Sequence, residues 1–197
     1  MSLVFSLCNF YVKIFFEVKI LNLKTYAKVN ITLDITGKRP NGYHDVLMIM
    51  QEISLYDNIV IEKSDELSVW CNKSYIPCDR RNIAYKAAEA FFEYTQIKGG
   101  ADIRIYKSIP TGAGLGGGSS NGAGVIMALN KLYDTSLTVD ECMKIGAKIG
   151  ADVPFFMLGG TCLAEGIGEI LTPLPDMPEC FLVLAKPKIH VSTKWVY

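Results

Sequence analysis

The clearest alternation of apolar and polar residues lies between residues 23 and 36. Apolar side chains occupy the odd positions from Ala27 to Ile35, and polar ones occupy the even positions. This period of two predicts a strand with one buried face. Lys28 and Asn30 would lie side by side on its polar face, which by pattern alone is a solvated surface. Turn residues follow at 40–42, and a partner strand is expected after them.

The rest of the chain mixes short strand patterns with helical ones. A helix is expected from Asn82, as its N-cap, to about Gln96, and another from the capping box at 138–141 to Gly150. A further helix is expected after a glycine-rich stretch at 109–124. The expected strands are 46–56, 59–62, 67–71, 101–107, 160–165, 168–171 and 180–185.

The stretch 109–124 is dominated by glycine, which makes up seven of its sixteen residues. Glycines tolerate positive φ, so successive backbone N–H groups can converge on one anion. Ser119, Ser120 and Asn121 are suitable N-cap residues for the helix that follows. We therefore expect a phosphate loop that leads into a helix N-terminus, in preference to a flexible linker. Gly116→Val is expected to obstruct nucleotide and to leave the protein folded.

The kinds of phosphate loop differ in their signatures. Gly112, Gly114 and Gly117 match the dinucleotide fingerprint, but the following helix leads to another helix, not to a strand that ends in an acid. The loop also lacks the lysine of a Walker A motif. Its sequence at 110–120, PTGAGLGGGSS, resembles the ATP loop of the GHMP kinase superfamily.

Asp152 stands just after the expected helix end at Gly150. Pro154 cannot continue a helix and pushes Val153 toward an extended conformation. We therefore expect Asp152 at a helix-to-strand corner, beside apolar side chains. An acid there is either a structural hydrogen-bond acceptor or a functional group, and the residues alone favour the structural role.

Composition excludes several classes of function. The 197 residues include 20 basic and 20 acidic side chains, so nothing indicates a nucleic acid or an acidic membrane as partner. The six cysteines are scattered, without a C-x-x-C pair or zinc spacing, as in a reducing cytosol. Residues 1–20 contain no run of the ~18 apolar residues that a spanning helix needs, and no signal-peptide cleavage site. A cytoplasmic protein is expected.

Three separated segments resemble one branch of the GHMP kinase superfamily. They are residues 27–44, which end in Gly-Tyr-His, the glycine loop, and residues 150–155, GADVPF; the hairpin 164–169 is also similar. The resemblance implies an α+β GHMP-kinase fold, with a ribosomal protein S5 domain 2-like N-terminal lobe. It also implies an ATP- and Mg²⁺-dependent kinase that phosphorylates the 2-hydroxyl of a cytidine-diphosphate methylerythritol in isoprenoid synthesis.

The resemblance also implies roles for particular residues. Asp152 would accept the proton of the attacking hydroxyl, while Lys28 would keep Asp152 ionised and offset charge on the transferred group. This division suits phosphoryl transfer, which depends on positioning and electrostatic stabilisation. The implied ATP-binding residues are Pro110, Gly112, Gly114, Leu115, Gly116, Gly117, Gly118, Ser119, Ser120, Asn82 and Lys107.

The cytosine base and the metal have their own candidates. Tyr43 would stack on the base, and His44 would hydrogen-bond to its edge, while Thr193 and Tyr197 would close the other side. Ser120 is the expected magnesium ligand. The implied substrate-binding residues are Asn30, Tyr43, His44, Asp152, Thr193 and Tyr197.

The resemblance covers only part of the expected architecture, because members of the branch continue beyond the position of Tyr197. Residues 21–158 are expected to form the ATP-binding domain, and residues 159–197 the incomplete start of a C-terminal, substrate-side domain. Residues 1–20 are either a real extra strand or upstream sequence before a start at Leu21. A truncated gene model is expected in preference to a protein that lacks part of its substrate site. Another small-molecule GHMP kinase and an inactive nucleotide-binding remnant remain alternatives, and a monomer or weak homodimer is expected.

Overall fold

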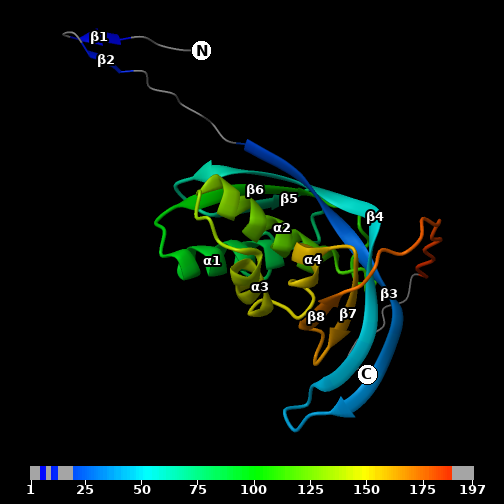
Figure 1. The fold of residues 1–197 in the computed structure, drawn as a ribbon. Helices are drawn as coiled ribbons and strands as arrows, with labels where there is room; N and C mark the ends of the chain where they lie inside the picture. Colours follow the sequence, from blue (N-terminus) through cyan, green and yellow to red (C-terminus); the bar gives the residue numbers. More distant parts are fainter. Residues whose placement is uncertain (1–4, 8–9, 13–19, 188–197) are drawn as a thin grey trace.

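The computed structural model describes residues 5–7, 10–12 and 20–187. Its main sheet has six strands in the order β5-β6-β4-β7-β8, with β3 paired to β4. All strand pairs in this sheet are antiparallel except β5 with β6. The helices α1 to α4 gather on one face of the sheet (Figure 1). Outside this sheet, β1 (Phe5–Leu7) and β2 (Phe10–Val12) form a separate antiparallel pair.

A long hairpin of β3 (Ile20–Lys38) and β4 (His44–Ser64) forms the spine of the sheet. The alternation at 23–36 predicted the first strand, but the expected division into a buried apolar face and a solvated polar face is wrong, because Ile31 and Ile35 are exposed and Lys28 is buried. The second replaces two expected strands, 46–56 and 59–62, because β4 continues through the break between them. An irregularity there shifts the register between Tyr26 and Ala27, so that Tyr26 pairs with Tyr56 and Ala27 with Ile53.

Two segments before the glycine loop form a helix of the helical layer and a strand of the main sheet. Helix α1 (Ile83–Thr95) begins after Asn82, whose side chain accepts a hydrogen bond from the Ala84 amide at 2.9 Å, so the predicted N-cap is confirmed. Strand β6 (Gly100–Tyr106) lies parallel to β5 (Ser68–Cys71) and leads into the loop.

Helix α2 (Gly117–Leu132) starts earlier than expected. Its N-cap is Gly116, at φ +68° and without a side-chain cap, so Ser119, Ser120 and Asn121 lie inside the first turns. The prediction of a serine or asparagine cap is therefore wrong. A left-handed glycine turns the chain into the helix instead, which leaves the first N–H groups without a capping side chain.

The region around Asp152 also differs from expectation. Helix α3 (Val139–Ala147) has the predicted capping box between Thr138 and Glu141. After the turns at residues 151–154 comes the short helix α4 (Phe155–Leu158), in place of a strand. Pro154 has helical dihedral angles and serves as the N-cap of this helix, a terminus at which its missing N–H carries no cost.

The last described strands are β7 (Thr161–Glu165), which pairs with β4, and β8 (Ile170–Pro173), which pairs with β7. They thus continue the main sheet beyond residue 158. The strand expected at 180–185 is absent from the structure, which has no regular element at those positions. Phe181 and Val183 are almost fully exposed there, so the apolar run has no sheet partner within the described residues.

The core lies between the sheet and the helices. Ile59 and Ile61 of β4 and Ile103 of β6 are completely buried against Phe91 of α1 and Leu129 of α2. A smaller cluster under β7 joins β4 to α4, with members Val46, Met48, Met50, Phe155, Cys162 and Ala164. Burial also raises the pKa of the Cys162 thiol. These contacts hold α2, and the loop before it, against the sheet.

Gly124 marks the closest approach of α2 to β3. A Cβ built there collides with Thr25 Cγ2 and lies 3.0 Å from Leu23 Cδ1. We expect Gly124→Ala to lower the free energy of unfolding by about 1–2 kcal/mol, because overpacking outweighs the better helix propensity of alanine. Denaturant titration of both proteins measures the change. Gly118→Ala on the same helix is the control, since its Cβ meets only the movable end of Ile83, and equal losses in the two variants would contradict this account.

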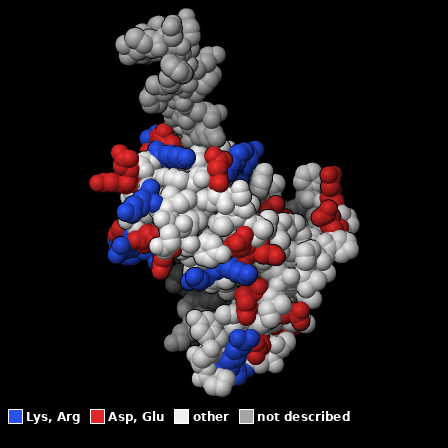
Figure 2. Space-filling model, turned by 60° about the vertical axis from the view of Figure 1, so that its left-hand side comes forward, with Lys and Arg blue, Asp and Glu red and all other residues white. Residues whose placement is uncertain are grey.

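The surface is consistent with the balanced composition. Basic and acidic side chains are interspersed on the face shown in Figure 2, without a broad region of one sign. In the described part of the chain, no helix has both the length and the apolar character needed to cross a membrane.

Candidate functional site

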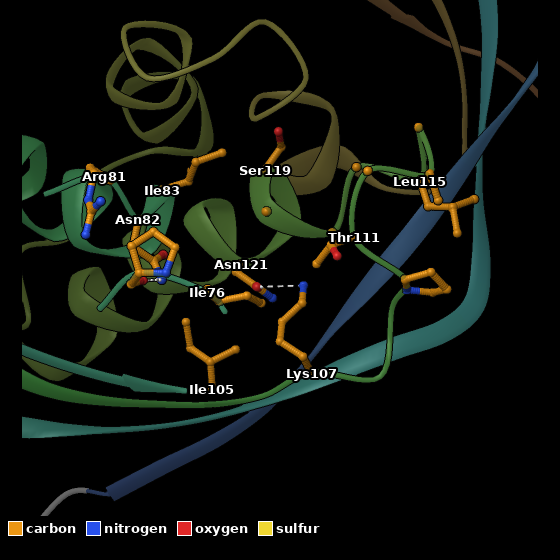
Figure 3. A pocket seen from close by; sticks show the side chains of 18 residues that line it. Ile76, Arg81, Asn82, Ile83, Ile105, Lys107, Thr111, Leu115, Ser119 and Asn121 are labelled. Carbon is orange, nitrogen blue, oxygen red and sulfur yellow. Dashed lines mark hydrogen bonds between the residues drawn. The ribbon is translucent and has the colours of Figure 1, made fainter. Parts of the chain in front are cut away.

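A pocket of about 330 Å³ lies where α1, α2, β6 and the glycine loop meet. In Figure 3, Ile76, Ile83 and Ile105 lie on one side of it, and Thr111 and Leu115 of the loop lie on the other. The pocket therefore has an apolar side and a side built mainly from backbone. Its lining residues are Ile76, Pro77, Arg81, Asn82, Ile83, Ile105, Lys107, Pro110, Thr111, Gly112, Ala113, Gly114, Leu115, Gly116, Gly117, Gly118, Ser119 and Asn121.

The loop presents its backbone to this pocket. Gly112, Gly114 and Gly116 have φ of +62°, +70° and +68°, in the left-handed region that glycine tolerates best. Helix α2 begins directly afterwards, so its first N–H groups lack partners within the helix and carry the positive end of its dipole. This arrangement is suited to bind an anion such as a phosphate group.

Gly116 also packs closely against two residues outside the loop, Phe156 and Lys28. A Cβ at this position would lie 2.5 Å from Phe156 Cζ and 3.2 Å from Lys28 Cγ. Together with the positive φ, this makes Gly116→Val a strained substitution that would also disturb Phe156 and Lys28, so it does not test the loop alone. Gly118, which lies inside α2, is the better position for probing the loop.

Lys28, Asn30 and Asp152 come together on the other side of Gly116. The Lys28 ammonium donates a hydrogen bond to Asn30 Oδ1 at 2.9 Å and lies 3.7 Å from Asp152 Oδ2. The Lys28 side chain is 6% exposed and that of Asp152 is 32% exposed, so the carboxylate is the member of the pair that solvent or a substrate can reach. The Lys28 amide also donates to the Leu115 carbonyl at 3.0 Å, which ties β3 to the loop.

Lys107 lies on the floor of the pocket within a buried polar network. Its ammonium donates to Asn121 Oδ1 at 3.2 Å, the bond drawn in Figure 3, and forms an ion pair with Asp57 of β4. Sequence reasoning missed Asp57 and Asn121. A signal was present, because Asp57 occupies the same face of β4 as the buried Ile59 and Ile61, where an acid needs a partner.

The other expected nucleotide residues divide between the pocket and its surroundings. Asn82 lines the pocket, and its side-chain amide also donates to the Pro77 carbonyl at 2.7 Å. Ser119 lines the pocket as well, whereas Ser120 is 2% exposed and does not. Within the described residues, no group of three or more His, Cys, Asp or Glu side chains could hold a metal ion, so the metal ligand stays a prediction.

Arg81, which lines the pocket, takes part in an ion pair. It forms a bidentate contact with Asp79, in which Nε donates to Oδ1 at 2.9 Å and Nη2 donates to Oδ2 at 2.7 Å. This hydrogen bonding lowers the pKa of Asp79 to about 2. Both side chains are exposed, so the guanidinium could exchange Asp79 for another anion at little cost.

The expected base-binding residues lie away from this pocket. Tyr43 and His44 are at the end of the β3–β4 hairpin, where the Arg39 amide donates to the Tyr43 carbonyl at 2.7 Å and Arg39 pairs with Asp45. The Tyr43 side chain projects, since this residue is 59% exposed. Thr193 and Tyr197 fall outside the described residues.

Comparison with known proteins finds relatives that share this fold. The sequence model for the GHMP kinases N terminal domain matches residues 82–160. A protein of Lachnoclostridium phytofermentans is 48% identical over 180 residues, 90% of this chain and 62% of that protein. One of Clostridium beijerinckii is 51% identical over 178 residues, 90% of this chain and 64% of that protein. A crystal structure matches with a TM-score of 0.67 and 38% identity, over 78% of this chain and 55% of the other.

These matches show that the chain has the fold of the GHMP kinases and that its residues 82–160 are similar to their N-terminal domain. Both bacterial relatives carry the more particular name 4-diphosphocytidyl-2-C-methyl-D-erythritol kinase, and the crystal structure is described as the same enzyme. The chain spans less than two thirds of the length of these curated relatives.

Proposed function

We propose that this chain transfers the γ-phosphoryl group of ATP to the 2-hydroxyl of 4-diphosphocytidyl-2-C-methyl-D-erythritol. The observation that carries the proposal is the meeting of Lys28 and Asp152, 3.7 Å apart, directly beside a glycine loop and a helix N-terminus. A cation, a reachable carboxylate and an anion site are the parts that phosphoryl transfer needs. The substrate is taken from the names of the relatives.

ATP would enter the pocket with its adenine on the apolar side, among Ile76, Ile83 and Ile105. Its phosphates would lie against the backbone N–H groups of the loop and of the first turn of α2. The γ-phosphate would then be nearest Gly116, on the side where Lys28 lies. Asn82 and Lys107, which also line the pocket, would contact the nucleotide as well.

Magnesium, when bound, would supply positive charge that offsets the charge of the phosphates. It is usually bound through phosphates, water and only one or two protein ligands, so the absence of an acidic cluster in the described residues does not conflict with it. Ser120 remains our predicted ligand, and the neighbouring Ser119, whose side chain lines the pocket, is a second hydroxyl within the same turn.

Asp152 would act as the general base by accepting the proton of the 2-hydroxyl as that oxygen attacks phosphorus. Lys28 would stabilise the charge that develops on the transferred group, and its hydrogen bond to Asn30 holds the ammonium in place. Tyr43 and His44 would bind the cytosine, Tyr43 by stacking and His44 by a hydrogen bond. Thr193 and Tyr197 would complete that side of the base.

A substitution at Gly118 tests whether the pocket binds nucleotide. We expect Gly118→Leu to lower ATP affinity at least about tenfold, because the new side chain would occupy space beside Ile83 while α2 keeps its backbone. Isothermal titration calorimetry with ATP measures the change. Ala147→Leu, at an exposed position of α3, is the matched control and should bind like the wild type. Unchanged affinity in the folded Gly118 variant would exclude this pocket as the ATP site.

A further inference from the structure

Asp57 is a completely buried carboxylate that accepts hydrogen bonds from four donors. Its Oδ1 accepts from the Ser108 and Ile109 amides, at 2.7 and 2.8 Å. Its Oδ2 accepts from Asn121 Nδ2 at 3.0 Å and from the Lys107 ammonium. One carboxylate oxygen therefore accepts hydrogen bonds from the backbone at the start of the loop, and the other accepts them from two side chains.

These contacts join segments that are distant in the sequence. Ser108 and Ile109 begin the glycine loop, Lys107 follows the last residue of β6, and Asn121 lies in the second turn of α2. Asn121 also donates to the Thr25 hydroxyl of β3 at 2.8 Å. The carboxylate thus fixes the position of the loop's first residues relative to the helix at its end.

Stability alone is a weak reason to bury an acid here. Taking a carboxylate and an ammonium out of water has a large cost, and replacing a buried ion pair with apolar residues is often neutral or stabilising. Asp57 occupies a position on the apolar face of β4, where Ile59 and Ile61 follow it. An apolar residue there would leave the Ser108 and Ile109 amides and the Lys107 ammonium without this acceptor, so the reason for the acid lies with its partners.

Lys107 supplies that reason, because its ammonium lies directly under the start of α2. A Cβ at Gly117 would be 3.0 Å from Lys107 Nζ, and both residues line the pocket. An unpaired lysine has a flexible four-carbon stem. The bonds to Asp57 and Asn121 hold its ammonium at one point, next to the N–H groups that face the proposed phosphate site.

We propose that Asp57 is a positioning residue for the nucleotide phosphates. Its Oδ1 holds the start of the glycine loop, and its Oδ2 directs the Lys107 ammonium to the N-terminus of α2. This inference rests on the proposed function, since it assumes that the loop binds the phosphates of ATP.

Asp57→Asn tests this inference with a change of only one atom. Whichever way the amide turns, its NH₂ group takes the place of an accepting carboxylate oxygen and therefore faces other hydrogen-bond donors. We expect ATP affinity to fall roughly 10- to 100-fold, the effect of losing a hydrogen bond that involves a charged group, while adenosine affinity stays within about twofold. A purely structural role would change the two affinities together. Asp102→Asn, on the exposed Asp102–Arg104 pair, is the matched control and should change neither.

The double variant Asp57→Asn/Lys107→Met covers the case in which the single variant does not fold. It removes the charged donor that conflicts with the new amide and leaves no buried charge, so we expect a folded protein that binds ATP as weakly as Lys107→Met alone. Wild-type ATP affinity in either folded Asp57 variant, or equal losses for ATP and adenosine, would overturn the positioning role alone. Failure of the wild-type chain to bind ATP would overturn the proposed function as well.

Discussion

Replacement of Asp152 with asparagine is expected to lower turnover roughly 10²- to 10⁴-fold, with ATP binding nearly unchanged. Asparagine keeps the size and the hydrogen bonding of the side chain but cannot accept the proton of the attacking hydroxyl. Asp152 does not line the nucleotide pocket, so its loss should leave the binding of ATP alone. Steady-state ADP release and calorimetry with ATP measure the two quantities separately.

Lys28 should behave as the second half of the same unit. We expect Lys28→Ala to lower turnover by a similar factor, and the double variant to be little worse than either single one, because residues that act together are not additive. Asp34→Asn is the matched control, since Asp34 is an exposed aspartate farther along β3. If Asp152→Asn retained wild-type turnover, Asp152 would not be the base.

The second large effect concerns the base of the substrate. A cytidine substrate should be used with a kcat/KM on the order of 10⁴-fold higher than its uridine analogue, because a site built to hydrogen-bond one polar edge leaves groups unpaired with the other. His44→Ala should reduce this preference without changing ATP binding. The ratio of kcat/KM for the two substrates, measured in wild type and variant, gives the answer.

Tyr94→Ala serves as the control for substitutions at the hairpin end, because Tyr94 is a partly exposed aromatic residue of α1 that does not line the pocket. It should leave the preference for cytidine intact. Equal use of the cytidine and uridine substrates by the wild-type protein would show that Tyr43 and His44 do not bind the base.

Local patterns predicted the parts of this molecule whose geometry is local. The period of two in residues 23–36 was sufficient to predict β3 and to set Lys28 beside Asn30, since side chains two residues apart in a strand share a face. The N-cap of α1 and the capping box of α3 were predicted for the same reason, because each depends on residues only two or three positions apart.

The errors arose where one residue is compatible with two structures. Pro154 was interpreted as ending helical structure, yet proline is equally suited to the start of a helix, and α4 follows it. The apolar run at 180–185 has the pattern of a strand, but a strand also needs a neighbour, which the structure does not provide among the described residues. Glycine at the start of α2 took the place of the expected polar cap.

The site depended most on long-range contacts. The donors to Asp57 come from residues 107–109 and 121, and no spacing rule connects them to β4. The contact of Gly116 with Phe156 and Lys28 likewise joins three separate segments. The family resemblance was therefore needed to associate Lys28 with Asp152, a pair that the structure places 3.7 Å apart.

Phosphorus NMR of one reaction mixture tests the central claim most directly. The chain is incubated with ATP, Mg²⁺ and 4-diphosphocytidyl-2-C-methyl-D-erythritol, and the Clostridium beijerinckii relative serves as a parallel sample. We expect the γ-phosphate signal of ATP to fall while a phosphomonoester signal from the substrate's 2-position rises in equal amount. Binding of ATP without this new signal, under conditions in which the relative produces it, would contradict the proposed kinase activity of the chain.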